Sequence, residues 1–413
     1  MTTSGVGTRS VLRVGIGGLG VGATAMMAEA AAHPRVKIVA GADPRPEARE
    51  KFASQFGAET YRTLEDMCES PNVDLVYVMT PNRMHAGHAV VAAEHGKQVL
   101  LDKPMGLTLA ECDAVIQAAD RNGVRVLVGH TQSLDPANLR MAEIVRTGEL
   151  GRPLMINTWF YSDWFYRPRC PEELDPSLGE GLVMRQGPVQ VDMVRMLGGG
   201  MARGVRASTT AIHPDRPIEG AYMAYVEFEN GASASLTYNA YAHFDSTELT
   251  WGLGLRGRVV DPDTNLKSRR QMASLSKEQE NAYKDSTRYG NPRASGGVIT
   301  GEGAMRHAFF GITLVSCERG DVRQTPEGIM IYGDDKHWEE RIPAGDGYSR
   351  RYTTVELDAM YDAWSRDAPL TLHDARWAKG TTEICLGILQ SARDRREIPL
   401  AHQTPYRGAG AVM

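Results

Sequence analysis

The feature that most constrains this chain is the alternation of short apolar runs with helical segments over its first third. The apolar runs predict strands at 12–17, 36–42, 73–80, 98–101 and 124–129. The segments between the runs predict helices at 23–32, 45–56, 85–95 and 110–122. Alternation at this spacing produces crossover units and a parallel sheet, and the nearly unbroken apolar strands require both faces to be covered. We therefore predict an α/β fold whose N-terminal domain, residues 11–129, is a doubly wound parallel sheet.

After about residue 150 the pattern changes to longer strands with tight turns. Strands are predicted at 153–161, 204–211, 221–229, 232–239, 329–332 and 337–342, and amphipathic helices at 354–366 and 375–393. The Asn230-Gly231 pair supplies positive φ for a hairpin and predicts antiparallel pairing. The polar stretch 262–297 is predicted to be an insertion, partly helical around 274–283. Residues 130–403 are expected to form an α+β domain with a mainly antiparallel open sheet.

Composition excludes several classes of protein. The 46 basic and 51 acidic residues give a net charge of −5, without the basic face that nucleic-acid or membrane-surface binding requires. No apolar run reaches the ~18–20 residues that span a bilayer. The N-terminus is small and polar without a secretory pattern, and the 5 cysteines are scattered with no Cys-x-x-Cys. We therefore expect a cytoplasmic protein with reduced thiols that binds neither nucleic acid nor membrane.

The turn after the first predicted strand is rich in glycine. Two overlapping fingerprints fit it, and the one that contains Gly18 and Gly20 places its glycines after the strand, with Leu19 between them. Glycines at such a turn let the backbone approach a pyrophosphate, and the helix that follows offers free N–H groups. Asp43 ends the second strand, 23 residues beyond Gly20, where an acid accepts hydrogen bonds from a ribose. This context predicts a dinucleotide site.

The choice of cofactor depends on Arg45, two residues after Asp43. Arg45 could pair with a 2′-phosphate, or it could be a solvated residue of the first helical turn. Because Asp43 would repel that phosphate, we predict NAD, with NADP as the alternative.

Polar residues also follow the third and fourth strands. The third ends near Thr80, Asn82 and His85, and the fourth ends in Asp102-Lys103-Pro104. The carboxyl ends of strands in a doubly wound sheet border the ligand crevice, so we predict that these residues contact the cofactor. Lys103 could bind a substrate hydroxyl with a lowered pKa, or it could extend into water; the local residues do not decide between these.

Several motifs together resemble the glucose–fructose oxidoreductase and inositol dehydrogenase family. They are the Gly-rich turn, Asp43, Thr80-Pro81-Asn82-x-x-His85, Ala93-x-x-Gly96-Lys97, Asp102-Lys103-Pro104 and Gly148-x-Leu150-Gly151-x-Pro153. The family usually has Glu-Lys-Pro, so Asp102 is a mild departure. The resemblance implies a Rossmann domain plus an open antiparallel sheet, NAD(P) chemistry on alcohols, and a catalytic Lys103. It also implies a homodimer or homotetramer built through the outer face of the sheet.

A second family motif lies at 179–192, on a helix that the resemblance places against the nicotinamide. Its closing acid is kept as Asp192, which is predicted to be catalytic. Arg185 stands where the family usually has Asp, and Val189 stands where it usually has the catalytic His. Valine cannot transfer a proton, so Lys103 would act alone or through water, or the chain has given up this chemistry. His130, at the end of the fifth strand, is the nearest substitute for the missing imidazole, or it is a residue of the domain joint.

The predicted substrate is a cyclic anion. Arg185 in the pocket wall suggests a carboxylate ligand, since guanidinium binds carboxylates through two hydrogen bonds. The aromatic loop 159–166, with Tyr161 and the nearby Arg167, could supply a wall for a flat ligand or could pack between domains. Segments 185–188, 315–324 and 331–334 resemble phthalate dihydrodiol dehydrogenases, which oxidise cis-dihydrodiols of aromatic carboxylates. Lys103, Tyr161, Arg167, Arg185 and Val189 are the predicted substrate contacts.

Other functions remain open at this point. A sugar or cyclitol dehydrogenase would give the arginines no anion to hold, and a nucleotide-binding protein with impaired turnover would explain Val189. The pair His85 and His88 has no third ligand spaced nearby, so we expect no metal. The sequence has no Gly-x-Ser-x-Gly elbow to support a nucleophilic serine.

Overall fold

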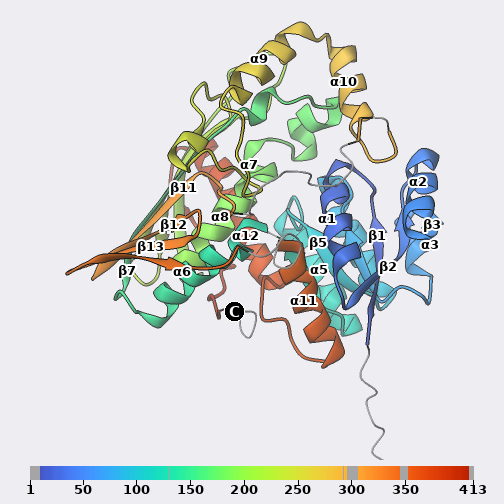
Figure 1. The fold of residues 1–413 in the computed structure, drawn as a ribbon, viewed down its shortest axis with the longest axis horizontal. Helices are drawn as coiled ribbons and strands as arrows, with labels where there is room; N and C mark the ends of the chain where they lie inside the picture. The colour runs from blue at the N-terminus through green and yellow to red at the C-terminus, as the bar shows by residue number, and fades with distance from the viewer. Residues whose placement is uncertain (1–9, 130, 292, 295–305, 345–351, 409–413) are drawn as a thin grey trace, which may run out of the picture.

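The computed structural model describes residues 10–129, 131–291, 293–294, 306–344 and 352–408. Its strands form two sheets, one built from the first third of the chain and one from the rest (Figure 1). No helix within these described ranges is long and apolar enough to cross a membrane.

The first sheet has six strands in the order β3-β2-β1-β4-β5-β6, and every neighbouring pair is parallel. The strands are β1 (Leu12–Gly17), β2 (Val36–Ala42), β3 (Glu59–Tyr61), β4 (Leu75–Val78), β5 (Gln98–Asp102) and β6 (Val126–Gly129). The connecting helices are α1 (Val21–Ala32), α2 (Pro46–Phe56), α3 (Leu64–Cys68), α4 (His85–Glu94) and α5 (Leu109–Asn122). The order in which strands are added reverses at β1: β2 and β3 lie on one side of it, and β4, β5 and β6 lie on the other. Ligands of doubly wound sheets bind next to this switch point, between β1 and β4. The predicted Rossmann sheet is confirmed.

The second sheet has nine strands in the order β14-β13-β12-β11-β7-β10-β9-β8-β15. They are β7 (Pro153–Tyr161), β8 (Ala202–Thr210), β9 (Ala221–Phe228), β10 (Ser233–Asn239), β11 (Ile312–Cys317), β12 (Gly320–Thr325), β13 (Gly328–Gly333), β14 (His337–Arg341) and β15 (Ile398–Pro399). All neighbours are antiparallel except β7 and β10, so the sheet is mixed but mainly antiparallel, as predicted. The predicted hairpin joins β9 to β10, with Gly231 at φ +87°.

The remaining helices pack against the second sheet, against the first sheet, or against both. They are α6 (Pro136–Thr147), α7 (Leu182–Arg185), α8 (Gly187–Leu197), α11 (Tyr352–Ser365) and α12 (Ala375–Asp394). Helix α12 packs against β8, α8 and α5, and α11 packs against α1, β5 and β6. Helix α12 therefore links the two sheets, whereas α11 packs against the first sheet, and the division at residue 130 stays a prediction. Short 3₁₀ turns occur at Asn82–Met84, Thr131–Leu134, Trp164–Tyr166, Pro171–Leu174, Pro176–Leu178 and Ser246–Leu249.

The predicted insertion contains two helices, α9 (Thr264–Ser274) and α10 (Lys277–Ser286). Sequence reasoning placed helix only around 274–283, and it missed α9 because that segment has no apolar stripe. The side chain of Ser276 caps α10 by accepting a hydrogen bond from the Gln279 N–H. Figure 1 shows these helices above the molecule, with α10 on the side of α1 and α2.

Candidate active site

The glycine-rich turn lies between β1 and α1. Gly18 adopts φ +92°, its N–H donates to the Ala42 carbonyl at 2.8 Å, and a Cβ there would lie 2.8 Å from the Met79 oxygen. A side chain is therefore excluded at Gly18 by both conformation and contact. Gly20 is the N-cap of α1, and nothing lies within 4 Å of the position that its Cβ would take. The helix thus presents an open N-terminus, which suits a pyrophosphate.

Gly20→Val should weaken NADH binding roughly tenfold or more, because the new side chain would occupy the approach to the helix N-terminus. The fold should tolerate the change, since Gly20 has φ −81° and open space around it. Calorimetry with NADH measures the effect. Gly87→Val is the matched control, because Gly87 also has nothing within 4 Å but lies in α4. Unchanged affinity in a folded Gly20→Val variant would contradict the assignment of this turn.

Asp43 and Arg45 lie beside this turn and bind each other. The Asp43 carboxylate accepts hydrogen bonds from Leu19 N–H at 2.9 Å and from Arg45 Nε at 3.0 Å, and it is 6% exposed. The same guanidinium donates to the Leu19 carbonyl at 2.7 Å. Because Arg45 already holds a carboxylate, it is poorly placed to receive a 2′-phosphate as well. The geometry supports NAD over NADP.

The turn after β4, the strand next to β1, carries a hydrogen-bond donor that has no acceptor among the described atoms. Asn82 Nδ2 is buried and has no hydrogen-bond partner among the described atoms. A buried amide N–H without a partner is costly, which points to a ligand that completes it. The unpartnered Asn82 amide and the open N-terminus of α1 together form a site that suits a dinucleotide.

His85 lies between two turns of the first sheet, and its predicted contact with the cofactor stays a prediction. It is 1% exposed, with Nδ1 at 2.8 Å from the Pro104 oxygen and Nε2 at 2.7 Å from the Thr80 oxygen. These contacts tie the turn after β4 to the turn after β5. The Thr80 hydroxyl lies 2.9 Å from His88 Nδ1. Within the residues described, no group of three or more His, Cys, Asp or Glu could hold a metal.

Lys103 follows β5 and reaches the helix pair α7–α8. Its Nζ donates to the Arg185 carbonyl at 2.6 Å, and its N–H donates to Asp102 Oδ1 at 2.9 Å. Burial lowers the pKa of Lys103; Asp102 opposes this shift, while the nearby Arg185 guanidinium adds to it. The structure thus brings together the two motifs that sequence analysis singled out separately. A lysine in this setting can exchange a proton more readily than one in water.

The Arg185 side chain belongs to a cluster of charges beside Lys103. It contacts Glu180 at 2.7 Å and Glu173 at 2.8 Å. Glu173 also lies 3.4 Å from Lys284 Nζ and 3.8 Å from Arg169. Burial alone would raise the pKa of Glu173, but the surrounding cations lower it to about 2. This charge cluster (Arg169, Glu173, Glu180, Arg185, Lys284) contains three cations and two carboxylates, so it has a surplus of one positive charge.

Arg169 is the most deeply buried cation of the cluster. It is 6% exposed, its guanidinium lies 4.0 Å from the centre of the Trp164 ring, and Nη2 donates to the Trp164 oxygen at 2.9 Å. Its Nε has no hydrogen-bond partner among the residues that the structure describes. Burial, together with repulsion from Arg185, lowers its pKa to about 9. An incompletely bonded guanidinium in such a place can accept an anion.

Much of the aromatic loop 159–166 is buried in the protein core and does not line an open pocket. Trp164 and Phe165 are 3% and 1% exposed and belong to the core, and Arg167 pairs with Asp163 at 2.7 Å. Tyr161 is partly exposed and stays a predicted substrate contact.

Asp192 lies in a fully buried joint between α8 and α12. It accepts hydrogen bonds from Ser133 Oγ at 2.5 Å and Trp377 Nε1 at 2.6 Å, and His373 Nε2 lies 3.1 Å away. These contacts support a positioning role, and its predicted catalytic role stays untested. Val189 is 4% exposed in the core, and His130 lies outside the described residues.

Two residues of the charge cluster, Glu173 and Lys284, were missed by sequence reasoning. Glu173 lies in a 3₁₀ turn and Lys284 lies in the insertion, over a hundred residues further along the chain. No local spacing links them, so only the fold could bring them together.

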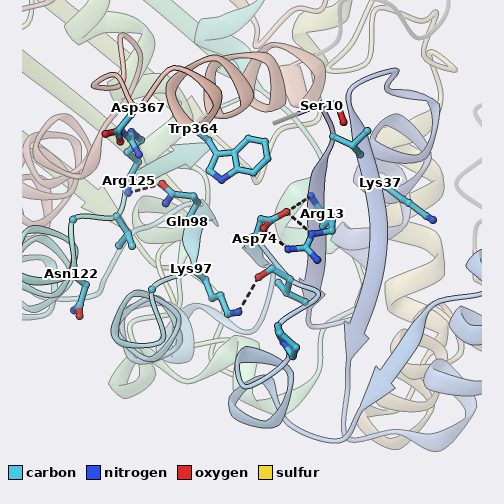
Figure 2. A pocket seen from close by; sticks show the side chains of 16 residues that line it. Ser10, Arg13, Lys37, Asp74, Lys97, Gln98, Asn122, Arg125, Trp364 and Asp367 are labelled. Carbon is cyan, nitrogen blue, oxygen red and sulfur yellow. Dashed lines mark hydrogen bonds and ion pairs between the residues drawn. The ribbon is translucent and has the colours of Figure 1, made fainter. Parts of the chain in front are cut away.

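A separate cavity of about 880 Å³ lies at the opposite edge of the first sheet (Figure 2). Several of its charged groups are paired with one another or with the backbone. Arg13 contacts Asp74 at 2.7 Å, Arg125 contacts Asp367 at 2.7 Å, and Lys97 donates to the Ser70 oxygen at 2.7 Å. This edge carries the amino ends of the strands, whereas ligands bind at the carboxyl ends. We therefore assign the active site to the Lys103 side.

Two family models match the chain. One, described as an oxidoreductase family with an NAD-binding Rossmann fold, matches residues 12–130. The other, a GFO/IDH/MocA C-terminal domain, matches residues 138–260. Together the models cover more than half of the chain, and they include both the glycine-rich turn and the helix that carries Arg185.

Known relatives extend the match over nearly the full length. The 1-carboxy-3-chloro-3,4-dihydroxycyclohexa-1,5-diene dehydrogenase of Comamonas testosteroni is 33% identical over 92% of this chain and 95% of its own. The NAD(+)-dependent scyllo-inositol 2-dehydrogenase of Bacillus subtilis strain 168 is 28% identical over 49% of this chain and 59% of its own. A crystal structure from Bordetella bronchiseptica RB50, assigned as a dehydrogenase, has a TM-score of 0.85 at 36% identity and covers 94% of this chain and 100% of its own.

Proposed function

Because the chain belongs to the GFO/IDH/MocA family of NAD-binding oxidoreductases, we propose that it oxidises a cyclic cis-dihydrodiol that carries a carboxylate. The family and the relatives are NAD(P)-dependent dehydrogenases that act on CH–OH groups, and the chain is such an enzyme. The resemblance predicted from the sequence motifs is thus confirmed. The substrate is the part that we propose.

The proposed reaction converts one carbinol of the diol to a carbonyl. NAD, when bound, accepts the hydride from the carbinol carbon. Lys103 takes the hydroxyl proton, directly or through water, as the C=O bond forms. The remaining carbinol carbon then loses its proton while the carbonyl oxygen gains one, which gives a catechol. The ring becomes aromatic in this last step, so the overall oxidation has a strong driving force.

The observation that carries the substrate proposal is the surplus positive charge next to Lys103. A neutral polyol would leave the extra cation of the charge cluster without a partner in a buried place, which is costly. A substrate carboxylate would balance it. The Comamonas testosteroni relative is named for a carboxylated dihydroxycyclohexadiene, which has both the anion and the diol.

A sugar or cyclitol dehydrogenase is the alternative. The scyllo-inositol relative favours it, but that match covers only about half of this chain. The sequence alternative of a nucleotide-binding protein with impaired turnover becomes an expectation of slow turnover in a dehydrogenase, because Val189 stands where the resemblance places the catalytic histidine.

The deciding experiment follows NADH formation at 340 nm with the purified protein. The substrates are 3,4-dihydroxycyclohexa-1,5-diene-1-carboxylate, the same diol without the carboxylate, and scyllo-inositol, each with NAD and with NADP. We expect the carboxylated diol with NAD to give the highest kcat/KM. Faster oxidation of the inositol would contradict the proposal, and a preference for NADP would contradict the cofactor assignment.

The outer face of the second sheet supports a homodimer or homotetramer. Trp159 on β7 and Met223 on β9 flank Thr237 of β10 in register, and Tyr225 lies two residues along β9. These three apolar side chains are 48%, 62% and 45% exposed. Such an apolar patch on a sheet face is typical of an interface. Analytical ultracentrifugation should therefore detect an oligomer, and Met223→Asp should shift the equilibrium between oligomer and monomer toward the monomer.

A further inference from the structure

The insertion arm, residues 262–294, reaches from the second sheet to both ends of the candidate site. Its helix α10 supplies Lys284 to the charge cluster. Just beyond that helix, the Tyr289 carbonyl accepts a hydrogen bond from Arg45 at 3.0 Å, and its hydroxyl donates to Gln55 at 2.7 Å. The arm is therefore fastened to the first domain next to the cofactor turn, and this contact fixes the position of Lys284.

Lys284 has spare capacity to bind an anion. Its Nζ lies 3.4 Å from Glu173, but that carboxylate is already held by Arg185 at 2.8 Å and by the Cys170 N–H at 3.0 Å. The Lys284 side chain is 20% exposed, so its ammonium is only partly solvated. Burial lowers the pKa of Lys284; Glu173 counteracts this shift, whereas the neighbouring arginines add to it. A second carboxylate would satisfy the remaining donors.

Arg169 also has a donor to spare, and its guanidinium lies 3.8 Å from the same Glu173 oxygen that Lys284 approaches. Arg169 is more than nine-tenths buried, and within the described part of the chain its Nε donor has no hydrogen-bond partner. Both cations are linked to Lys103 through two residues, Glu173 and Arg185, because Arg185 contacts Glu173 with its side chain and Lys103 with its carbonyl. Arg169 is also near enough to Lys103 to lower its pKa, so an anion bound by Lys284 and Arg169 would lie near the proton-transfer group.

We propose that Lys284 and Arg169 bind the carboxylate of the substrate and so turn its diol toward Lys103. This inference rests on the proposed function and names the residues that select an anionic substrate. The insertion arm then acts as a specificity element: it supplies one of the two cations, and its anchor at Tyr289 holds that cation in place.

The test compares Lys284→Met with the parent protein by calorimetry, in complex with NADH. The probes are 3,4-dihydroxybenzoate and catechol, which differ only in the carboxylate. The variant should lose roughly ten- to a hundredfold in affinity for 3,4-dihydroxybenzoate, because a charge-assisted contact is removed. Its affinity for catechol should stay unchanged. Lys277→Met is the matched control, since Lys277 lies on the same helix but pairs with Asp215 at 74% exposure.

Equal loss for both probes, or no loss for either, would overturn the inference. So would a parent protein that binds catechol as tightly as 3,4-dihydroxybenzoate, or that binds neither. Turnover separates the two proposals. If the parent binds 3,4-dihydroxybenzoate through Lys284 but does not oxidise the carboxylated diol, the proposed function is wrong and the anion site stands. If it oxidises that diol equally well without Lys284, the function stands and the anion site is wrong.

Discussion

Lys103→Met should lower kcat for diol oxidation by roughly 10²–10⁴-fold, the usual contribution of a proton-transfer group. Methionine keeps the length of the stem but cannot take a proton or bind the Arg185 carbonyl, which Lys103 Nζ contacts at 2.6 Å. Steady-state kinetics with NAD and the best substrate measures the effect. Lys97→Met is the control, because Lys97 lies at the opposite edge of the sheet and donates to the Ser70 oxygen.

The pH profile distinguishes proton transfer from a purely structural role. A base must be neutral to act, so kcat/KM for oxidation should rise with pH until it passes the pKa of Lys103. Burial places that pKa below the ordinary lysine value, so the rise should end earlier than for a solvated lysine. Lys103→Arg keeps the charge but cannot give up its proton. If the arginine variant retains most activity, Lys103 acts through charge alone and the general-base assignment is wrong.

The first sheet could be predicted almost completely from local pattern. β1 and β2 occupy the predicted ranges, because each is a nearly unbroken apolar run of the kind that forms a buried strand. β3, with only three residues at the edge of the sheet, escaped prediction since it has no such run. In the second sheet, β11 and β12 were not predicted as strands. Neither segment has an unbroken apolar run or a strict alternation of apolar and polar residues, so it is their pairing with β7 and β13 that identifies them as strands.

The parts of the candidate site that lie in turns directly after strands could be predicted from the sequence. The glycine-rich turn and Lys103 follow strands at fixed offsets, and the structure places both at the carboxyl edge of the sheet. Side-chain partners could not be predicted in this way. The sequence indicates Arg185 as a free carboxylate clamp, whereas the fold gives it Glu173 and Glu180 as partners. The predicted contact of Arg185 with substrate is untested, and the surplus charge lies with Arg169 and Lys284.

Val189→His should raise kcat by roughly 10²-fold or more and change KM much less, because an imidazole there would act mainly in the transition state. Arg185, whose carbonyl holds Lys103, is the last residue of α7. Val189 lies in the first turn of α8, directly after the break at Gln186. We expect a histidine at position 189 to lie near this junction. Val189 is 4% exposed, so the larger ring should cost about 1–3 kcal/mol of stability through overpacking. Thermal unfolding measures this cost separately from the kinetics.

The control for added bulk is Val189→Phe, which introduces a ring without a titratable nitrogen. Only the histidine variant should gain activity, and this gain over the parent protein should disappear when the pH is lowered through the ordinary pKa of histidine, because a protonated imidazole cannot serve as a base. If the parent protein is already fast and the histidine variant is neutral or slower, the proton leaves by a route that does not need position 189. Tyr161, which ends β7 and is partly exposed, would then be the next residue to replace. A phenol there could pass the proton from the substrate to water, so Tyr161→Phe should slow the parent protein.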